Sequence, residues 1–281
     1  ENNCKDCYKC IRTCSVKAIS FTHNQAQIIP SECVLCGSCF VVCPQKAKQI
    51  RDDISLVKDA IAAGKQVLCS LAPSFIADFH VHDLSDMETA LCELGFSGVQ
   101  ETAIGAQLVS DAYAEIMQKK KQSILITSCC PTINLLVQKY YPTMLPYLAK
   151  VLTPAQAHCR LLKQENKDCF TVFIGPCIAK KDEADNSPYI DVALTYDELR
   201  LWMADAHVQL PRATGVSQAG KKSRLYPATG GILKATDPVP GYRRVAIDGV
   251  DNCRMVFSEL ERGNISNAFI EMSACEGSCI N

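Results

Sequence analysis

The segment "SILITSCC", residues 123–130, is a short apolar run that ends at two adjacent cysteines, Cys129 and Cys130. The same pattern returns in "CFTVFIGPC" (169–177) and in "AFIEMSAC" (268–275). Short apolar runs bounded by turn residues are typical of strands buried in parallel sheets. Ligands of such sheets gather beyond the carboxyl ends of the strands. These cysteines are therefore predicted to lie at a binding site.

Helix and strand patterns alternate around these runs. Apolar residues recur at helical spacing in residues 52–64, 83–94 and 104–117. The strand candidates are residues 66–71, 123–127, 169–174, 192–195, 245–247 and 268–272. Thr195 and Glu198 fit a capping box at the start of a further helix. The alternation predicts a two-lobed α/β domain with largely parallel sheets over residues 51–281.

Cysteines at or just after the strand ends are numerous enough to hold a [4Fe-4S] cluster, with the ligands Cys130, Cys177, Cys275 and Cys279. The alternative is that they are small buried hydrophobic residues. We expect that role instead for Cys69, Cys92, Cys159, Cys169 and Cys253. Adjacent side chains on an extended chain point to opposite faces, so a single metal atom is not expected to bind both Cys129 and Cys130. The two thiols are predicted to have different roles.

The first 50 residues hold a denser cysteine pattern, two copies of C-x2-C-x2-C-x3-C. This is the run of bacterial ferredoxins, in which the fourth cysteine of each run binds the other cluster. It predicts one [4Fe-4S] cluster at Cys4, Cys7, Cys10 and Cys43, and a second at Cys33, Cys36, Cys39 and Cys14. Zinc and disulfides are the alternatives, but zinc favours isolated C-x2-C pairs and such short spacings disfavour mutual disulfides. We expect residues 1–50 to form an α+β ferredoxin-like module held together by its clusters.

The overall composition is that of a globular protein: 281 residues with 48% hydrophobic and 21% charged residues. The formal net charge of −1 provides no electrostatic footprint for nucleic acid. No apolar stretch is long enough to span a bilayer, and no export signal is visible. We therefore expect a cytoplasmic protein that binds neither nucleic acid nor membranes.

Three segments together resemble the active-site signatures of the [FeFe]-hydrogenase family: "TSCCP" (127–131), "PCIAKKDE" (176–183) and "ACEGSC" (274–279). The segments "APS" (72–74) and "ATGG" (228–231) are also similar to stretches that line the family's active-site pocket. The resemblance implies an H-cluster, in which a [4Fe-4S] cubane shares the Cys279 sulfur with a di-iron unit. That unit carries CO, cyanide and a bridging azadithiolate. The implied reaction is 2H⁺ + 2e⁻ = H₂, with electrons passing along the ferredoxin-type clusters.

The resemblance also implies roles for individual residues around the di-iron unit. Lys180 matches the family lysine that pairs with one cyanide, and Ser74 matches a hydrogen-bond donor to the other. Buried cyanide charges need such partners. Cys129 matches the cysteine that relays protons to the azadithiolate amine, a task suited to a thiol. Lys181 is expected to be a solvated neighbour.

The sequence departs from the family pattern where protons would leave the site. A glutamate and a serine that usually continue the proton path correspond to Ala112 and Ala149. Two methionines of the family signatures correspond to Gly175 and Ser273. These departures resemble divergent members of the family to which a sensory role is assigned. We expect slow turnover and a different proton path, for which the candidates are Glu276, Glu271, Glu115 and Glu183.

Three functions remain open at this stage. The chain is expected to be a hydrogenase, a hydrogen or redox sensor with the same cofactor, or a hydrogenase-like iron–sulfur protein without the di-iron unit. The last would act in electron transfer or cluster assembly. The expected substrates are H₂ and protons, and the expected partner is a redox protein such as ferredoxin or a signalling domain. Retention of Cys129 and Lys180 favours a complete H-cluster, because a cubane alone needs neither residue.

Overall fold

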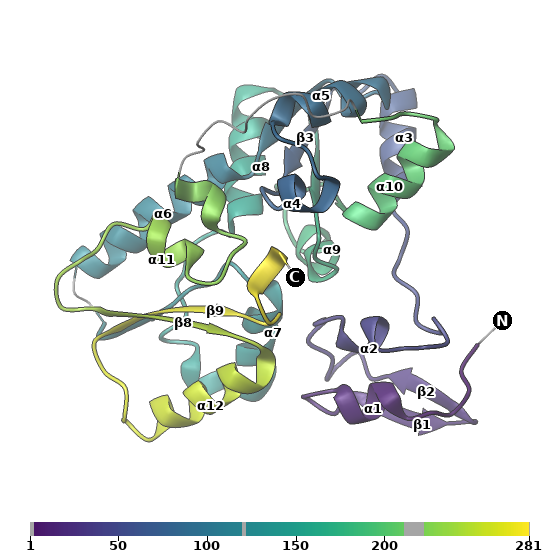
Figure 1. Cartoon of the computed structure of the whole chain (residues 1–281). Helices are drawn as coiled ribbons and strands as arrows, with labels where there is room; N and C mark the ends of the chain where they lie inside the picture. The colour runs from purple at the N-terminus through teal and green to yellow at the C-terminus, as the bar shows by residue number, and fades with distance from the viewer. Residues whose placement is uncertain (1–2, 120–121, 211–221, 281) are drawn as a thin grey trace.

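The computed structural model describes residues 3–119, 122–210 and 222–280. A small N-terminal module lies beside a larger part of the chain that contains two separate sheets (Figure 1). The module contains α1 (Lys9–Thr13), an antiparallel hairpin of β1 (Ile19–Thr22) and β2 (Gln25–Ile28), and α2 (Ser38–Val41). Its core is small and comprises Cys10, Cys14, Ala18, Ile19 and Ala26. So few buried apolar side chains provide little free energy of folding, as expected for a module that metal clusters stabilise.

The first lobe of the large domain is built on a four-stranded sheet whose neighbouring strands are all parallel. Its order is β4 (Gly98–Glu101), β3 (Val67–Leu71), β6 (Phe170–Gly175) and β7 (Val192–Thr195). Four helices pack on it: α3 (Ile54–Ala62), α5 (Leu84–Glu93), α8 (Pro154–Glu165) and α10 (Tyr196–Asp205). Two shorter helices follow the carboxyl ends of β3 and β6, namely α4 (Phe75–Phe79) and α9 (Ala179–Asp185).

The second lobe has a three-stranded parallel sheet. Its order is β5 (Ile124–Ile126), β9 (Ala268–Ser273) and β8 (Arg243–Asp248). Alternate strand residues face opposite cores, because side chains on a strand have a period of two. Ile126 and Ile270 pack with α7 (Pro131–Tyr140) and α12 (Val250–Glu261). Leu125 and Phe269 pack with α6 (Ala103–Gln118) and α11 (Gly231–Ala235).

The two lobes meet where α6 crosses α8. Gly105 permits this contact, since a Cβ atom at that position would lie 2.1 Å from the Pro154 carbonyl oxygen and 2.8 Å from His158 Cβ. Three single turns complete the described chain: η1 (Pro142–Met144), η2 (Lys222–Leu225) and η3 (Ser278–Ile280). The last of these lies between the lobes, near the C-terminal label in Figure 1.

The parallel sheets confirm the predicted α/β class of the large domain, and the helix beginning at Tyr196 has the predicted capping box. The strand predicted over residues 245–247 is longer, Arg243–Asp248, and β4 was not predicted. Cys92 is exposed, contrary to the expectation that it packs in the core. The other four cysteines assigned to the core, Cys69, Cys159, Cys169 and Cys253, are buried. Within the described ranges, no helix is both long and apolar enough to cross a membrane.

Candidate active site

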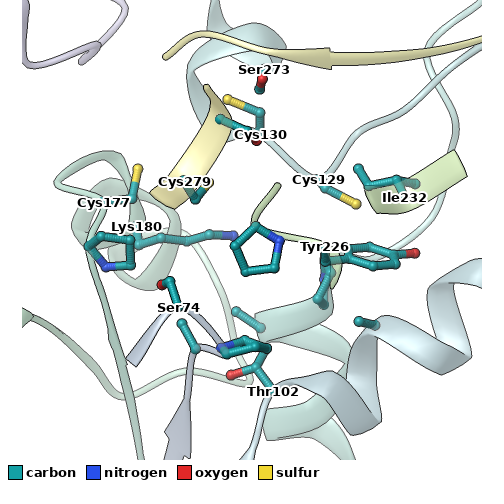
Figure 2. Close-up of a pocket in the computed structure, with 18 of the residues that line it drawn as sticks. Ser74, Thr102, Cys129, Cys130, Cys177, Lys180, Tyr226, Ile232, Ser273 and Cys279 are labelled. Carbon is teal, nitrogen blue, oxygen red and sulfur yellow. The ribbon is translucent and has the colours of Figure 1, made fainter. Parts of the chain in front are cut away.

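The carboxyl ends of both parallel sheets converge on one cavity of about 110 Å³, drawn in Figure 2. That volume is several times what one buried water needs. The loops after β3, β5, β6 and β9 supply Ser74, Cys130, Cys177 and Cys279 respectively. Much of the remaining wall is small or apolar: Ala72, Pro73, Ala106, Pro154, Ala155, Pro227 and Ile232. The cavity can therefore enclose a compact group that reaches thiols on one side and apolar surface on the other.

Three of the four predicted cubane ligands line this cavity, and the fourth, Cys275, lies beside it. Burial raises the pKa of Cys177 to about 12 and that of Cys275 to about 11, and the nearby thiols add to each shift. Burial likewise raises the pKa of Cys279, with contributions from Cys177, Cys130 and Cys275. None of the four forms a disulfide. Cys275 and Cys279 retain surface exposure, but four thiolates this close repel one another and need a positively charged metal group to be stable.

A single metal ion does not fit this arrangement. Within the described ranges, no three His, Cys, Asp or Glu side chains converge closely enough to hold one ion. A single zinc ion would draw thiolates to within about 2.3 Å of one point. In a cubane each thiolate binds its own iron, so the ligands stand further apart. The donor set and its spacing therefore suit an iron–sulfur cluster.

Lys180 enters the cavity from α9, and its side chain runs below Cys177 and Cys279 in the view of Figure 2. Its Nζ donates a hydrogen bond to Glu183 Oε2 at 2.7 Å, and Glu183 also accepts one from Thr153 Oγ1. Burial lowers the pKa of Lys180, but the Glu183 charge and hydrogen bond and the nearby cysteines outweigh it, so the pKa is raised overall. The ammonium group is thus a buried cation. Glu183 lies at the site as the partner of this cation.

Lys181, on the same helix, is not the solvated neighbour that we expected. Its side chain is 7% exposed and forms ion pairs of 2.8 Å with both Asp53 and Glu198. It also donates to the Ala193 carbonyl at 3.0 Å. Asp53 in turn pairs with Arg51, in the segment that leads out of the N-terminal module. This buried network ties the connecting segment to the helix that carries Lys180.

Ser74 lines the cavity, but its hydroxyl group already has a partner. Ser74 Oγ lies 2.9 Å from the Tyr196 hydroxyl, which donates to the Ala72 carbonyl at 2.8 Å. Since Tyr196 uses its one proton on Ala72, Ser74 must donate to Tyr196. Donation from Ser74 to a ligand in the cavity would require its hydroxyl to rotate. Sequence reasoning missed Tyr196, whose position reads as the first turn of an ordinary helix.

Cys129 and Cys130 project to different sides of their loop in Figure 2, as expected for an extended chain. The Cys129 sulfur lies 3.1 Å from the hydroxyl oxygen of Tyr113, a fully buried residue of α6. That hydroxyl accepts a hydrogen bond from the Ser128 amide at 3.0 Å. Burial raises the pKa of Cys129 to about 12, although Tyr113 and Lys180 oppose the shift. Sequence reasoning missed Tyr113, because a tyrosine on the apolar face of a helix reads as core.

Of the four glutamates proposed for a proton path, Glu271 alone lines the cavity. Its carboxylate accepts hydrogen bonds from the amides of Gly230 (2.9 Å) and Leu233 (3.0 Å). Burial raises the pKa of Glu271 more than these amides lower it. Glu276 and Glu115 are exposed, and neither lines the cavity. Glu115 instead pairs with Lys119 on the surface of α6.

The departures from the family pattern have visible structural counterparts. A Cβ atom at Gly175 would lie 2.7 Å from the ring of Phe173, which lines the cavity. The glycine and the aromatic ring therefore fit each other. Ala112 lines a separate hollow between α6 and α8. No carboxylate therefore extends from that position toward Cys129.

The N-terminal module contains two further cavities, each lined by four cysteines. One contains Cys4, Cys7, Cys10 and Cys43. The other contains Cys14, Cys33, Cys36 and Cys39. These are the groupings expected when the fourth cysteine of each run binds the other cluster.

The second set lies next to the large domain. A Cβ atom at Gly37 would contact Ile178 at 3.4 Å. Burial and Cys130 are the larger causes of the raised pKa of Cys275, and the Cys36 thiol adds to them. Lys139 of α7 donates to the Cys33 carbonyl at 2.7 Å. This cavity is thus placed between the other four-cysteine set and the candidate active site.

Comparisons with known proteins agree with this arrangement. The family of the iron-only hydrogenase large subunit, C-terminal domain, matches residues 65–240 and 239–281. The 4Fe-4S dicluster domain matches residues 3–47. Iron hydrogenase 1 of Clostridium pasteurianum is 25% identical over 85% of this chain and 53% of its own length. The chain thus spans about half the length of that relative.

A second group of relatives has a different role. The cytosolic Fe-S cluster assembly factor NAR1 of Yarrowia lipolytica is 26% identical over 58% of this chain and 38% of its own length. Among solved structures, a variant of [FeFe]-hydrogenase HydA1 from Chlamydomonas reinhardtii matches with a TM-score of 0.63 at 19% identity. The match covers 80% of this chain and 83% of that one. This likeness establishes a common fold.

Proposed function

Because this chain belongs to the iron-only hydrogenase family, we propose that it catalyses 2H⁺ + 2e⁻ = H₂ at an H-cluster in the cavity. The proposed cofactors are three [4Fe-4S] clusters and a di-iron unit with CO, cyanide and azadithiolate ligands. Turnover is slow, in keeping with a sensory role. The observation that carries the proposal is the convergence of three cysteines, Lys180 and Cys129 on one cavity.

When bound, the di-iron unit supplies an open iron site and an amine base at which H₂ is split or formed. The chain's residues hold and enclose it. Cys130, Cys177, Cys275 and Cys279 bind the cubane. The Lys180 ammonium provides a buried positive charge for anionic ligands, and the proline and alanine walls exclude water.

Cys129 gives and accepts a proton at its sulfur. The surroundings of this thiol support slow transfer, because within the described ranges its hydrogen-bond partner is the Tyr113 hydroxyl and not a carboxylate. The onward group that we propose is Glu271, which lines the same cavity and acts on the pKa of Cys129. Carboxylates exchange protons with solvent far more readily than a buried phenol does.

A second candidate function is favoured by the NAR1 relatives, which are named cytosolic Fe-S cluster assembly factors. In that case the cavity would hold only a cubane. The chain would then act in electron transfer or cluster assembly without H₂ chemistry. Cys129 and Lys180 would have no task at the site, since a cubane is complete with four thiolates.

The deciding experiment loads the iron-reconstituted protein with a synthetic di-iron cofactor under anaerobic conditions. Infrared bands of metal-bound CO and cyanide, together with H₂ uptake and evolution, are the expected results. Full cluster loading without those bands would favour the assembly or electron-transfer function.

A variant separates the proton relay from cofactor binding. Cys129→Ala should retain the infrared bands and lose most of the H₂ activity, because only the relay is removed. Cys92→Ala is the matched control, since Cys92 is an exposed cysteine that does not line the cavity. Equal activity in both variants would show that protons bypass Cys129.

A further inference from the structure

A chain of polar side chains leads away from the active-site cavity through the core of the first lobe. Thr102, the residue before α6, lines the cavity and lies at the lower edge of the view of Figure 2. Its Oγ1 lies 2.7 Å from Ser70 Oγ, which in turn lies 2.8 Å from His158 Nδ1. His158 Nε2 then lies 3.1 Å from Gln100 Oε1. Consecutive hydrogen bonds therefore connect the cavity wall with Gln100.

The two ends of this chain differ in their access to solvent. Ser70 and His158 are 0% exposed, and Thr102 is 4% exposed. Gln100 lies on β4, an edge strand of the four-stranded sheet, and is partly exposed. A satisfied buried network contributes little more to stability than apolar side chains of the same shape. Stability alone therefore does not account for a polar path between the cavity and the edge of the sheet.

The direction of each hydrogen bond follows from the acceptor at the outer end. The amide oxygen of Gln100 can only accept, so His158 Nε2 carries a proton. Burial lowers the pKa of His158 to about 4, so the imidazole is neutral near pH 7 and its Nδ1 is an acceptor. Ser70 therefore donates to His158 and accepts from Thr102. All three donors point away from the cavity, as a relay that releases protons requires.

We propose that Thr102, Ser70 and His158 form a proton relay between the cavity and the surface. This inference rests on the proposed hydrogenase function, in which protons leave and enter the cavity. Thr102 Oγ1 accepts a proton from the cavity side while its own proton passes to Ser70, and the Ser70 proton passes to His158 Nδ1. The imidazolium then releases its Nε2 proton to solvent beside Gln100. One proton enters the chain and one leaves it, and the reverse sequence delivers a proton to the cavity.

The relay is separate from the route that we propose through Glu271. Glu271 belongs to β9 of the second lobe, whereas Ser70 belongs to β3 of the first. A substitution in one route therefore leaves the groups of the other in place. The relay is slow, because its hydroxyl groups and imidazole ring must return to their first orientation before another proton follows. This property agrees with the slow turnover proposed for the chain.

The test follows proton exchange at Cys129 and needs no di-iron unit. Cys129 lines the same cavity as Thr102. The iron-reconstituted protein, without the di-iron unit, is transferred into D₂O, and the conversion of the Cys129 S–H group to S–D is followed by its infrared stretching band. Cys129→Ala identifies that band among those of the other free cysteines. The rate of conversion reports how quickly solvent protons reach the cavity.

His158→Gln blocks the relay and retains its hydrogen bonds. A glutamine amide can accept from Ser70 and donate to Gln100, as the imidazole does, but it does not take up a proton near neutral pH. Leu162→Ala is the matched control. Leu162 lies one turn further along α8, is 1% exposed and does not line the cavity. Its truncation destabilises the same helix and removes no atom of the relay.

We expect His158→Gln to slow the exchange at Cys129 about threefold or more. Leu162→Ala should leave the rate unchanged or raise it, because a destabilised protein opens more often. Ser70→Ala interrupts the chain at its middle and should slow the exchange as His158→Gln does.

Exchange at the wild-type rate in either relay variant would overturn the proposal, and so would equal slowing by Leu162→Ala. The proposed function is tested separately by loading the wild type with the di-iron cofactor. Slowed exchange in the relay variants, together with a loaded wild type that makes no H₂, would refute the proposed function and leave the relay standing.

Discussion

Replacement of Lys181 by methionine should destabilise the large domain strongly, although the residue makes no contribution to the cavity wall. Lys181, Asp53 and Glu198 have side chains that are 7%, 6% and 8% exposed, so their charges are largely desolvated. Methionine retains most of the side-chain volume and removes the cation, so two carboxylates share a buried site. Breaking a buried ion pair by removing one partner costs about 3–5 kcal/mol. Asp53 retains Arg51, so we expect the lower end, about 3 kcal/mol.

The chain contains its own probe for this measurement. Trp202 is its single tryptophan, lies one turn after Glu198 in α10 and is 4% exposed. Urea unfolding of the iron-loaded protein, followed by Trp202 fluorescence under anaerobic conditions, should show a midpoint lowered by about 1 M or more. Lys167→Met provides a surface control expected to change stability by less than about 0.5 kcal/mol.

A combined variant tests the electrostatic origin of the effect. Lys181→Met/Asp53→Asn/Glu198→Gln removes the cation and both anions together. It should recover at least half of the lost stability, because uncompensated buried charge is the main cost. A Lys181→Met variant as stable as the wild type would refute the reasoning, and so would a triple variant no more stable than the single one.

Three further predictions concern the cavity and its surroundings. Lys180→Met/Glu183→Gln removes both members of the buried ion pair. This variant should keep the fold and the cluster iron, while the infrared bands of a loaded di-iron unit fall severalfold. Undiminished bands would show that the cation is dispensable. Tyr113→Phe leaves the Ser128 amide without its partner, so stability should fall by about 1–3 kcal/mol, and H₂ activity should drop with unchanged di-iron loading. Burial lowers the pKa of His158 from 6.5 to about 4, so between these values the unfolded chain binds a proton that the folded chain does not. The free energy of unfolding should therefore fall as pH drops from 7 to 5. Measured by urea unfolding, the difference in this free energy between the wild type and His158→Gln should shrink by about 2 kcal/mol over that range. Parallel pH dependences of the two proteins would contradict this.

The ferredoxin-like module and the class of the large domain were predictable because their signals are local or periodic. Cysteine spacing in each run is a short-range property, and buried parallel strands reveal themselves as short apolar runs. The convergence of Cys130, Cys177 and Cys279 followed from a general rule about strand ends. Their proposed role as cubane ligands stays a prediction that the loading experiment tests.

The partners of the site residues were not predictable in the same way. Tyr113 lies beside Cys129 because of how α6 is rotated about its own axis where it packs on β5 and β9. That rotation cannot be predicted from the spacing of residues along the chain. Tyr196 lies 122 positions from Ser74, yet their hydroxyl groups form a hydrogen bond. Lys181 was misjudged for the same reason, since Asp53 is 128 positions away.

The sequence by itself determined which atoms are available for chemistry: three groups of four thiols, a lysine beside one of them, and strands that end at cysteines. The tertiary structure alone decided how those atoms are paired, which thiols face one cavity, and which charges are buried. The physical reason is range. Spacing rules act over a few residues, whereas hydrogen bonds and ion pairs between distant segments depend on how helices and sheets pack, to within a few ångströms.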